Sequence, residues 1–201
     1  MDNRSMMTLA DGLNSEFDRL VGLQSQSGRI NKELYNKYDV KQGLRDANGR
    51  GVLTGLTEIA EVIGVIKKDG KAVPCEGLLH YRGYDVYRLL KDVRHERYNF
   101  EKATYLLLFG KLPDEQELAG FLNIIASLRE LSGSFVRDVI MKAPSENIMN
   151  ALQKSVLTLY SYDDAPDDIS EENVLRQCLQ LVAMFPLLAV YSYQAYRYDH
   201  G

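Results

Sequence analysis

Residues 77–86 read GLLHYRGYDV, and this stretch marks the point where the chain changes from extended to helical structure. Residues 78–81 can form a strand, Gly83 can make a tight turn, and helical spacing begins at Val86. Arg82 in this turn could bind a carboxylate or a phosphate with its planar guanidinium group. The residues alone favour a second interpretation, in which Arg82 pairs with a nearby acidic side chain and Gly83 makes the strand-to-helix turn.

Upstream of this stretch, β-branched residues and a turn signal predict one small β-hairpin. The turn signal is Lys68-Asp69-Gly70, because glycine tolerates the positive φ that tight hairpins require. We expect residues near Val62 to Ile66 to pair with residues near Leu78 to Tyr81, and we predict no other β structure. The β-branched residues of the first strand are Ile59, Val62, Ile63, Val65 and Ile66.

Helical periodicity covers most of the remaining chain. Before the hairpin we predict a helix over residues 14–28, a short helix that begins near Asn31, and a glycine-rich loop over residues 43–55. After the hairpin we predict helices over residues 86–93, 100–109, 118–128, 135–142, 148–159 and 170–198. The sequence therefore indicates a mainly α, multi-helical chain with one small β-hairpin.

Capping residues mark the ends of several of these helices. Gly110 is expected at a helix C-cap, where glycine adopts the left-handed conformation easily. Asp114 and Glu117 have the spacing of a capping box, in which each side chain accepts a backbone N–H of the other. The serines expected to cap the next three helices are Ser134, Ser145 and Ser170.

The last predicted helix is apolar on more than one side, so it must be covered on all sides. Leu181 and Leu188 are among its apolar residues, and we expect them to face a partner subunit or further helices. Pro186 lies within the helix and is expected to kink it. The sequence thus predicts self-association through this helix and the helix before it.

The composition of the 201 residues argues against several classes of protein. Hydrophobic residues make up 45% and charged residues 26%, which is typical of a globular protein, and the net charge of −4 argues against nucleic-acid binding. We find no signal peptide and expect no membrane span, because the apolar run over residues 181–190 is too short. Cys75 and Cys178 form no disulfide framework, so we expect free thiols and a cytoplasmic protein.

We find no sequence motif typical of a catalytic, phosphate-binding or metal-binding site. Phosphate-binding glycine motifs and the GxSxG nucleophile motif are absent, and Gly49-Arg50-Gly51 is interpreted as a flexible loop. His80, His95 and His200 lack the spacing of a metal site, and His95 is expected at a solvated helix end. The acidic run from Asp163 to Asp168 lacks the EF-hand pattern and is interpreted as capping and solvated residues. We therefore predict no catalytic, cofactor-binding or metal-binding residue, and no cofactor.

Four stretches, in the same order along the chain, resemble the citrate synthase family. Residues 77–86 resemble the RGY segment near the start of these enzymes, and residues 100–113, FEKATYLLLFGKLP, look like the family's FEEVAYLLLYGKLP. Residues 144–159 are similar, more loosely, to the segment PMDVLRTAVSAL, and residues 185–198 resemble the helix that ends in AYRY. The resemblance covers residues 56–201.

The resemblance implies a fold, a reaction and an assembly. This chain would be the N-terminal part of the family's large helical domain, with an N-terminal extension over residues 1–55, the hairpin over 56–85 and helices over 86–201. The family's full-length enzyme condenses acetyl-CoA with oxaloacetate to give citrate and CoA. It works as a homodimer, with an aspartate base and histidines that stabilise the enol and polarise the carbonyl group.

The family's catalytic histidine motifs do not occur in this chain. His200-Gly201 looks like the start of one of them, but it follows a helix end that lies upstream of that motif in the family. The resemblance therefore implies a truncated chain that lacks the catalytic residues and is inactive alone. Two alternatives remain open: part of a 2-methylcitrate synthase, or a non-catalytic helical interaction module.

Overall fold

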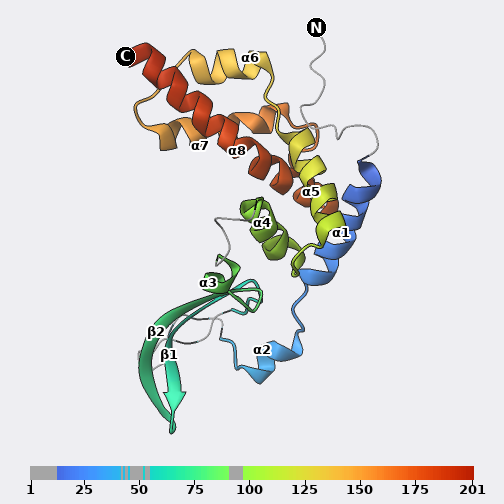
Figure 1. Ribbon diagram of the computed structural model, residues 1–201, viewed down its shortest axis with the longest axis vertical. Coiled ribbons are helices and arrows are strands. Elements are labelled where there is room, and N and C mark those ends of the chain that lie inside the picture. The colour runs from blue at the N-terminus through green and yellow to red at the C-terminus, as the bar shows by residue number, and fades with distance from the viewer. Residues whose placement is uncertain (1–12, 42, 44, 46–51, 53–54, 91–96) are drawn as a thin grey trace. The chain divides into compact units, whose positions relative to one another are not determined.

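The computed structural model describes residues 13–41, 43, 45, 52, 55–90 and 97–201. The chain forms two compact units, one of residues 1–21 with 119–201 and one of residues 22–118. Figure 1 shows the helices and the β-hairpin, and each unit is described separately below. The expectation that the whole chain belongs to one large domain stays a prediction.

The unit of residues 22–118 contains the β-hairpin. Strands β1 (Ala60–Lys68) and β2 (Lys71–Tyr81) are antiparallel, and the register places Val62 opposite Leu79 and Ile66 opposite Val73. Asp69 and Gly70 connect them with φ of 53° and 75°, the positive values of a type I′ turn. The predicted hairpin and its turn are therefore confirmed, although the strands extend further towards the turn than expected.

A third strand, β3 (Tyr84–Asp85), pairs with the end of β2, so the sheet has the order β1-β2-β3. The sequence analysis did not predict β3, because a strand of two residues leaves no periodic pattern. Helix α3 (Val86–Leu89) follows directly, and Asp85 caps it by accepting a hydrogen bond from the Arg88 backbone N–H. The predicted helix over residues 86–93 is confirmed as far as Leu89, and residues 91–96 lie outside the described residues.

In this unit, helices also begin or end where local sequence signals predict, including the start of α5, which continues into the other unit. Asn31 accepts the Glu33 N–H at the start of α2 (Glu33–Lys37). Helix α4 (Asn99–Phe109) ends at Gly110, whose φ is 79°. Asp114 and Glu117 form the predicted capping box of α5 (Glu115–Leu128), with N–H to oxygen distances of 2.8 and 3.1 Å.

The unit of residues 1–21 and 119–201 contains the first part of α1 (Asn14–Ser27), most of α5 and all later helices. These are α6 (Gly133–Phe135), the π-helical segment η1 (Val136–Met141), α7 (Ile148–Leu159), the 3₁₀ turn η2 (Tyr160–Tyr162) and α8 (Glu171–His200). Ser170 caps α8 by accepting the Asn173 N–H, as predicted. Helices α7 and α8 lie side by side (Figure 1).

Two predicted caps are wrong by two residues. Ser132, rather than Ser134, accepts the Phe135 N–H, and Asn147, rather than Ser145, accepts the N–H at the start of α7. A capping side chain lies two or three residues before the N–H that it accepts, and several adjacent polar residues satisfy that rule equally well in sequence. The expected α-helix over residues 135–142 is also largely π-helical, which side-chain periodicity does not reveal.

The hydrophobic core of this unit forms between the π-helical segment, α7 and α8. Its fully or nearly fully buried residues are Phe135, Ile140, Leu159, Met184 and Leu188. Leu181 packs against the same cluster and is only partly buried. The expectation that Leu188 faces a partner is therefore wrong, because this side chain is 0% exposed and belongs to the chain's own core.

Helix α8 is long and apolar enough to cross a membrane by length and composition alone. This corrects the expectation that no apolar segment of the chain is long enough to span a membrane. Core helices of globular proteins pass the same test, so this property is weak evidence for a membrane protein. Leu179, Ala183 and Met184 of α8 are 0% exposed within the chain. Its buried residues also include the polar side chains of Asn173 and Gln180.

Candidate functional site

The turn that the sequence singles out has an unusual backbone. Arg82 and Gly83 both have positive φ, 48° and 83°. The left-handed conformation is costly for a residue with a side chain, so the contacts of Arg82 must offset that cost. One of them is its backbone N–H, which donates to the Ile59 carbonyl oxygen at 2.8 Å and closes the base of the hairpin.

The Arg82 side chain donates to the carbonyl ends of two helices. Its Nε and Nη2 atoms lie 3.3 and 3.1 Å from the Leu107 oxygen of α4, and Nη1 lies 3.4 Å from the Ser27 oxygen of α1. Ser27 Oγ also donates to the Leu108 oxygen, at 3.1 Å. The last carbonyl groups of a helix lack intrahelical donors and carry partial negative charge, so a guanidinium is well suited to this position.

This arrangement corrects both interpretations of Arg82. Among the described residues no acidic side chain forms an ion pair with it, and its donors are already engaged by carbonyl oxygens. The second interpretation is right that the role is structural and wrong about the partner. The partners lie 25 and 55 residues away in sequence, so no local pattern could identify them.

A cavity of about 480 Å³ lies beside this turn. His80, Tyr84, Asp85 and Arg88 supply its polar lining, and the Nδ1 atom of His80 is buried without a hydrogen-bond partner. The cavity thus combines a guanidinium, an imidazole and a phenol. The carboxylate of Asp85, which caps α3, lines the same space and opposes the binding of an anion.

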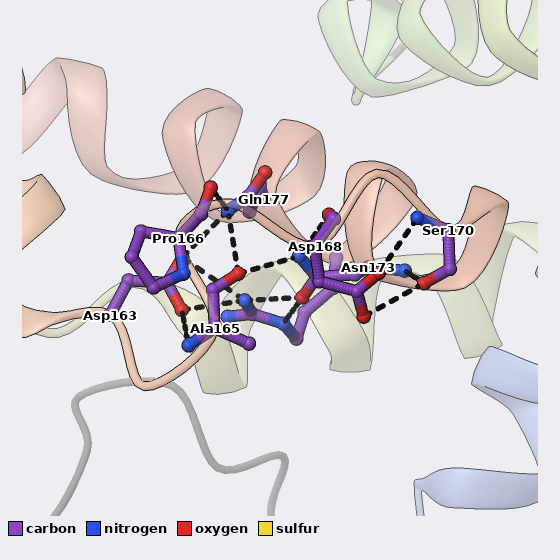
Figure 2. Close-up of polar contacts among 8 residues, drawn as sticks. Asp163, Ala165, Pro166, Asp168, Ser170, Asn173 and Gln177 are labelled. Carbon is purple, nitrogen blue, oxygen red and sulfur yellow. Dashed lines mark hydrogen bonds and ion pairs between the residues drawn. The ribbon is translucent and has the colours of Figure 1, made fainter.

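The second polar centre joins the acidic loop to α8 and is shown in Figure 2. Arg176 Nη2 lies 2.8 and 3.0 Å from the two carboxylate oxygens of Asp163. The Gln177 side-chain amide donates to the same carboxylate at 2.8 Å, and the Ala165 N–H donates at 3.0 Å. The side chains of Asp163 and Arg176 are 5% and 17% exposed, so this ion pair is largely removed from water.

Asn173 completes this network within the loop and helix. Its Nδ2 atom donates to the carbonyl oxygens of Ala165 and Asp168, at 2.9 and 2.7 Å, and its Oδ1 atom accepts from Arg176 (Figure 2). Asp168 accepts the N–H and the hydroxyl of Ser170 at the start of α8. Asp168 therefore holds the cap residue Ser170 rather than capping α8 itself, whereas Asp163 serves as an ion-pair partner.

The surroundings of Asp163 change its acidity. Burial acts to raise the pKa of its carboxyl group, but the hydrogen bonds from Gln177, Ala165 and Arg176, together with the charge of Arg176, lower the pKa overall. Asp163 is thus held as a carboxylate. Nearby, a hydrogen bond to Asp167 raises the pKa of the Tyr160 phenol.

A mainly apolar cavity of about 240 Å³ lies next to this network. Val156, Leu159, Pro166 and Leu181 supply its apolar lining, together with polar residues of the network. Gln180 also lines it, and its Nε2 atom is buried without a hydrogen-bond partner. This cavity could accept an apolar group, and the Asp163 carboxylate that lines it is already engaged by Arg176, Gln177 and the Ala165 N–H.

The remaining candidates from the sequence do not converge on a site. His80 lies on β2, His200 lies at the end of α8, and His95 and residues 49–51 lie outside the described residues. Across the described part of the chain, no three histidine, cysteine or acidic side chains are placed to hold a metal ion. Cys75 and Cys178 are free thiols, and burial raises the pKa of the half-buried Cys178, which disfavours its reactive thiolate.

Comparisons with known proteins agree on one family. Residues 44–200 match the sequence profile described as "Citrate synthase, C-terminal domain". A citrate synthase from Corynebacterium glutamicum is 27% identical over 195 residues, which cover 96% of this chain and 41% of the relative. Citrate synthase 1 from Mycobacterium tuberculosis is 30% identical over 125 residues, covering 59% of this chain and 26% of the relative.

A 2-methylcitrate synthase from Shewanella oneidensis is also similar, at 29% identity over 122 residues, which cover 61% of this chain and 30% of the relative. Among solved structures, citrate synthase from Pyrobaculum aerophilum matches with a TM-score of 0.55 and 27% identity, over 79% of this chain and 40% of that protein. The chain thus spans between about a quarter and two fifths of the length of these relatives.

The Asp163 network predicts a specific pH dependence of stability. Replacing Asp163 with Asn leaves Arg176 without its charged partner and should lower the free energy of unfolding by about 2 kcal/mol at pH 7. Because the folded-state pKa of Asp163 is lowered, its contribution is complete above the unfolded pKa of 3.8 and is lost as the pH falls through the lower folded value.

Urea denaturation of the Asp163→Asn variant and the parent chain from pH 7 to pH 3 measures this difference. It should be constant down to about pH 5 and shrink below about pH 4. Asp138→Asn is the matched control, because Asp138 pairs with Arg137 on the surface and its loss should change stability little. Equal effects of the two substitutions would contradict the assigned role of Asp163.

Proposed function

The chain belongs to the citrate synthase family, and from this premise we propose that it supplies helical scaffold to an enzyme that condenses acetyl-CoA with oxaloacetate. The observation that carries the proposal is the family match over residues 44–200, most of the chain. The reaction joins the methyl carbon of acetyl-CoA to the carbonyl carbon of oxaloacetate, and hydrolysis of the thioester then releases citrate and CoA. The helices from α4 to α8 would hold the elements that bind these substrates.

The proposal also concerns which acyl-CoA the enzyme uses. Relatives of both kinds are similar to this chain, including a 2-methylcitrate synthase and a protein from Bacillus subtilis named citrate/2-methylcitrate synthase. An acyl-CoA one carbon longer than acetyl-CoA would lead to 2-methylcitrate by the same chemistry. We place acetyl-CoA first because this chain covers 41% and 37% of two citrate synthases, against 30% of the 2-methylcitrate synthase from Shewanella oneidensis.

We further propose that the catalytic groups come from outside these 201 residues. Carbon–carbon condensation requires a base beside the methyl group and hydrogen-bond donors aimed at two developing oxyanions. The described histidines, His80 and His200, lie in different units of the chain. The base and donors would then lie in the part of the relatives that this chain does not cover. If the reading frame continues past Gly201 with histidine motifs, the enzyme proposal gains support over a stand-alone interaction module.

The chain on its own should therefore show no condensation activity. We expect no CoA release above background from the purified chain with oxaloacetate and either acetyl-CoA or the acyl-CoA one carbon longer. A mock preparation from host cells without the gene controls for host enzyme. Turnover that follows the chain through every purification step would contradict this proposal and would locate an active site within these residues.

We also propose that the chain forms a homodimer through α7 and α8. The exposed side of α7 carries Met149 and Leu157, 66% and 76% exposed, and that of α8 carries Phe185, Val190 and Tyr193, 43%, 54% and 49% exposed. Apolar side chains gathered on neighbouring helices normally mark a contact surface. We propose these exposed residues for the interface in place of Leu188, because Leu188 is buried in the core of the chain.

Charge placed on this surface should prevent association. Leu157→Asp and Val190→Asp alter exposed positions, so they should leave the fold intact and weaken the dimer by at least tenfold. Sedimentation equilibrium measures the change in dissociation constant. Ile169→Asp is the control, since Ile169 is 89% exposed but lies in the loop before α8. A parent chain that stays monomeric at high concentration would count against the proposal.

A further inference from the structure

A cavity of about 270 Å³ lies in the unit of residues 22–118, and none of the roles assigned above uses it. One side of helix α4 supplies much of its wall. The α4 residues in this wall are Asn99, Lys102, Ala103 and Leu106. They have the spacing i, i+3, i+4 and i+7, which places side chains on one side of a helix.

Two further segments complete the wall of this cavity. Leu112 and Pro113 follow the end of α4, where Gly110 with its φ of 79° turns the chain out of the helix. Residues 88–90, at the end of α3, supply the rest. The wall is therefore built by three segments of one unit, and the Gly110 cap that the sequence predicts helps to position one of them.

Most residues of the wall are apolar. Leu106 is 0% exposed, whereas Leu90 and Leu112 are 53% and 36% exposed. An apolar group that enters the cavity would remove these two leucine side chains from water, and this favours binding. The cavity has room for more than a benzene ring, because a cavity of about 150 Å³ is large enough to bind benzene.

The charged side chains in the wall are both positive. Arg88 comes from α3 and Lys102 from α4, and no acidic residue is among the described residues that line the cavity. The Arg88 backbone N–H donates to Asp85, but its side chain forms no hydrogen bond or ion pair within the described part of the chain. Its guanidinium group can therefore bind an anion with its planar fork.

We propose that this cavity binds a small organic carboxylate with an apolar body, such as an aryl or branched aliphatic acid. The carboxylate would lie at Arg88, with Lys102 adding positive charge, and the apolar body would lie against the leucines. A carboxylate fits better than a phosphate, because a second negative charge beside an apolar wall costs more to remove from water. Oxaloacetate has two carboxylates and no apolar body, so this site is separate from the proposed condensation.

Titration of the full chain with phenylacetate tests the proposal, with isotope-labelled leucine methyl groups followed by NMR. We expect saturable shifts of the Leu106 and Leu112 signals, because an aromatic ring changes the shifts of methyl groups beside it. The dissociation constant should be about 1 mM or lower. Leu179 and Leu188 lie in the other unit and should not shift. Phenylacetamide has the same shape without the charge and should bind at least tenfold more weakly.

Two variants test the residues of the site. Arg88→Gln should weaken the binding of phenylacetate at least tenfold. Lys68→Gln is the matched control, because it removes the same charge from an exposed position at the hairpin turn and should leave the affinity unchanged. Arg88 also lines the cavity beside His80, whereas Ala103 lines only the cavity proposed here. Ala103→Leu should therefore abolish the saturable shifts by filling the space.

Absence of saturable Leu106 and Leu112 shifts in the parent chain would overturn the site. Equal affinities for phenylacetate and phenylacetamide would overturn the assignment to carboxylates, and an unchanged affinity in Arg88→Gln would overturn the role of Arg88. Circular dichroism shows whether each variant folds, and Arg88→Gln, at an exposed position, decides the matter if Ala103→Leu does not fold. The readout is binding, so none of these outcomes depends on condensation activity.

Discussion

The contact between Arg82 and the carbonyl ends of two helices is the interaction on which the unit of residues 22–118 depends. One guanidinium donates to Leu107 of α4 and Ser27 of α1, and the backbone of the same residue closes the hairpin at Ile59. Three segments that are distant in sequence therefore meet at one residue with left-handed φ. The cost of that conformation is offset by hydrogen bonds that would otherwise be missing at the helix ends, because those carbonyl groups have no intrahelical donors.

Local patterns in the sequence predicted much of the fold, whereas contacts between distant segments could not be predicted. The Asp69-Gly70 turn, the Gly110 C-cap and the Asp114–Glu117 capping box are each determined by residues a few positions apart, and the structure confirms them. The partners of Arg82 are determined by packing between distant segments. The π-helical turn at residues 136–141 was missed for a related reason, because apolar spacing alone does not distinguish it from an α-helix.

The polar centre at Asp163 shows what the sequence could and could not reveal about the candidate site. The acidic run was visible, and its loop position and capping role were predicted. The ion pair was not predicted, although Arg176 and Gln177 are adjacent residues of α8 and lie 13 and 14 residues after Asp163. The centre holds the loop against the helix, and its donors and acceptors are used within the chain. This use is consistent with the proposed scaffold role of the helical unit.

The most direct test of this account is hydrogen exchange in an Arg82→Lys variant, with Arg137→Lys as the surface control. Lysine keeps the positive charge but cannot donate to both helix ends at once, since it lacks the planar fork. The account predicts that backbone amides at the end of α4 and at the base of the hairpin exchange at least tenfold faster than in the parent chain, while those of α7 are unchanged. Parent-like exchange at the end of α4 would contradict the claim that Arg82 holds this unit together.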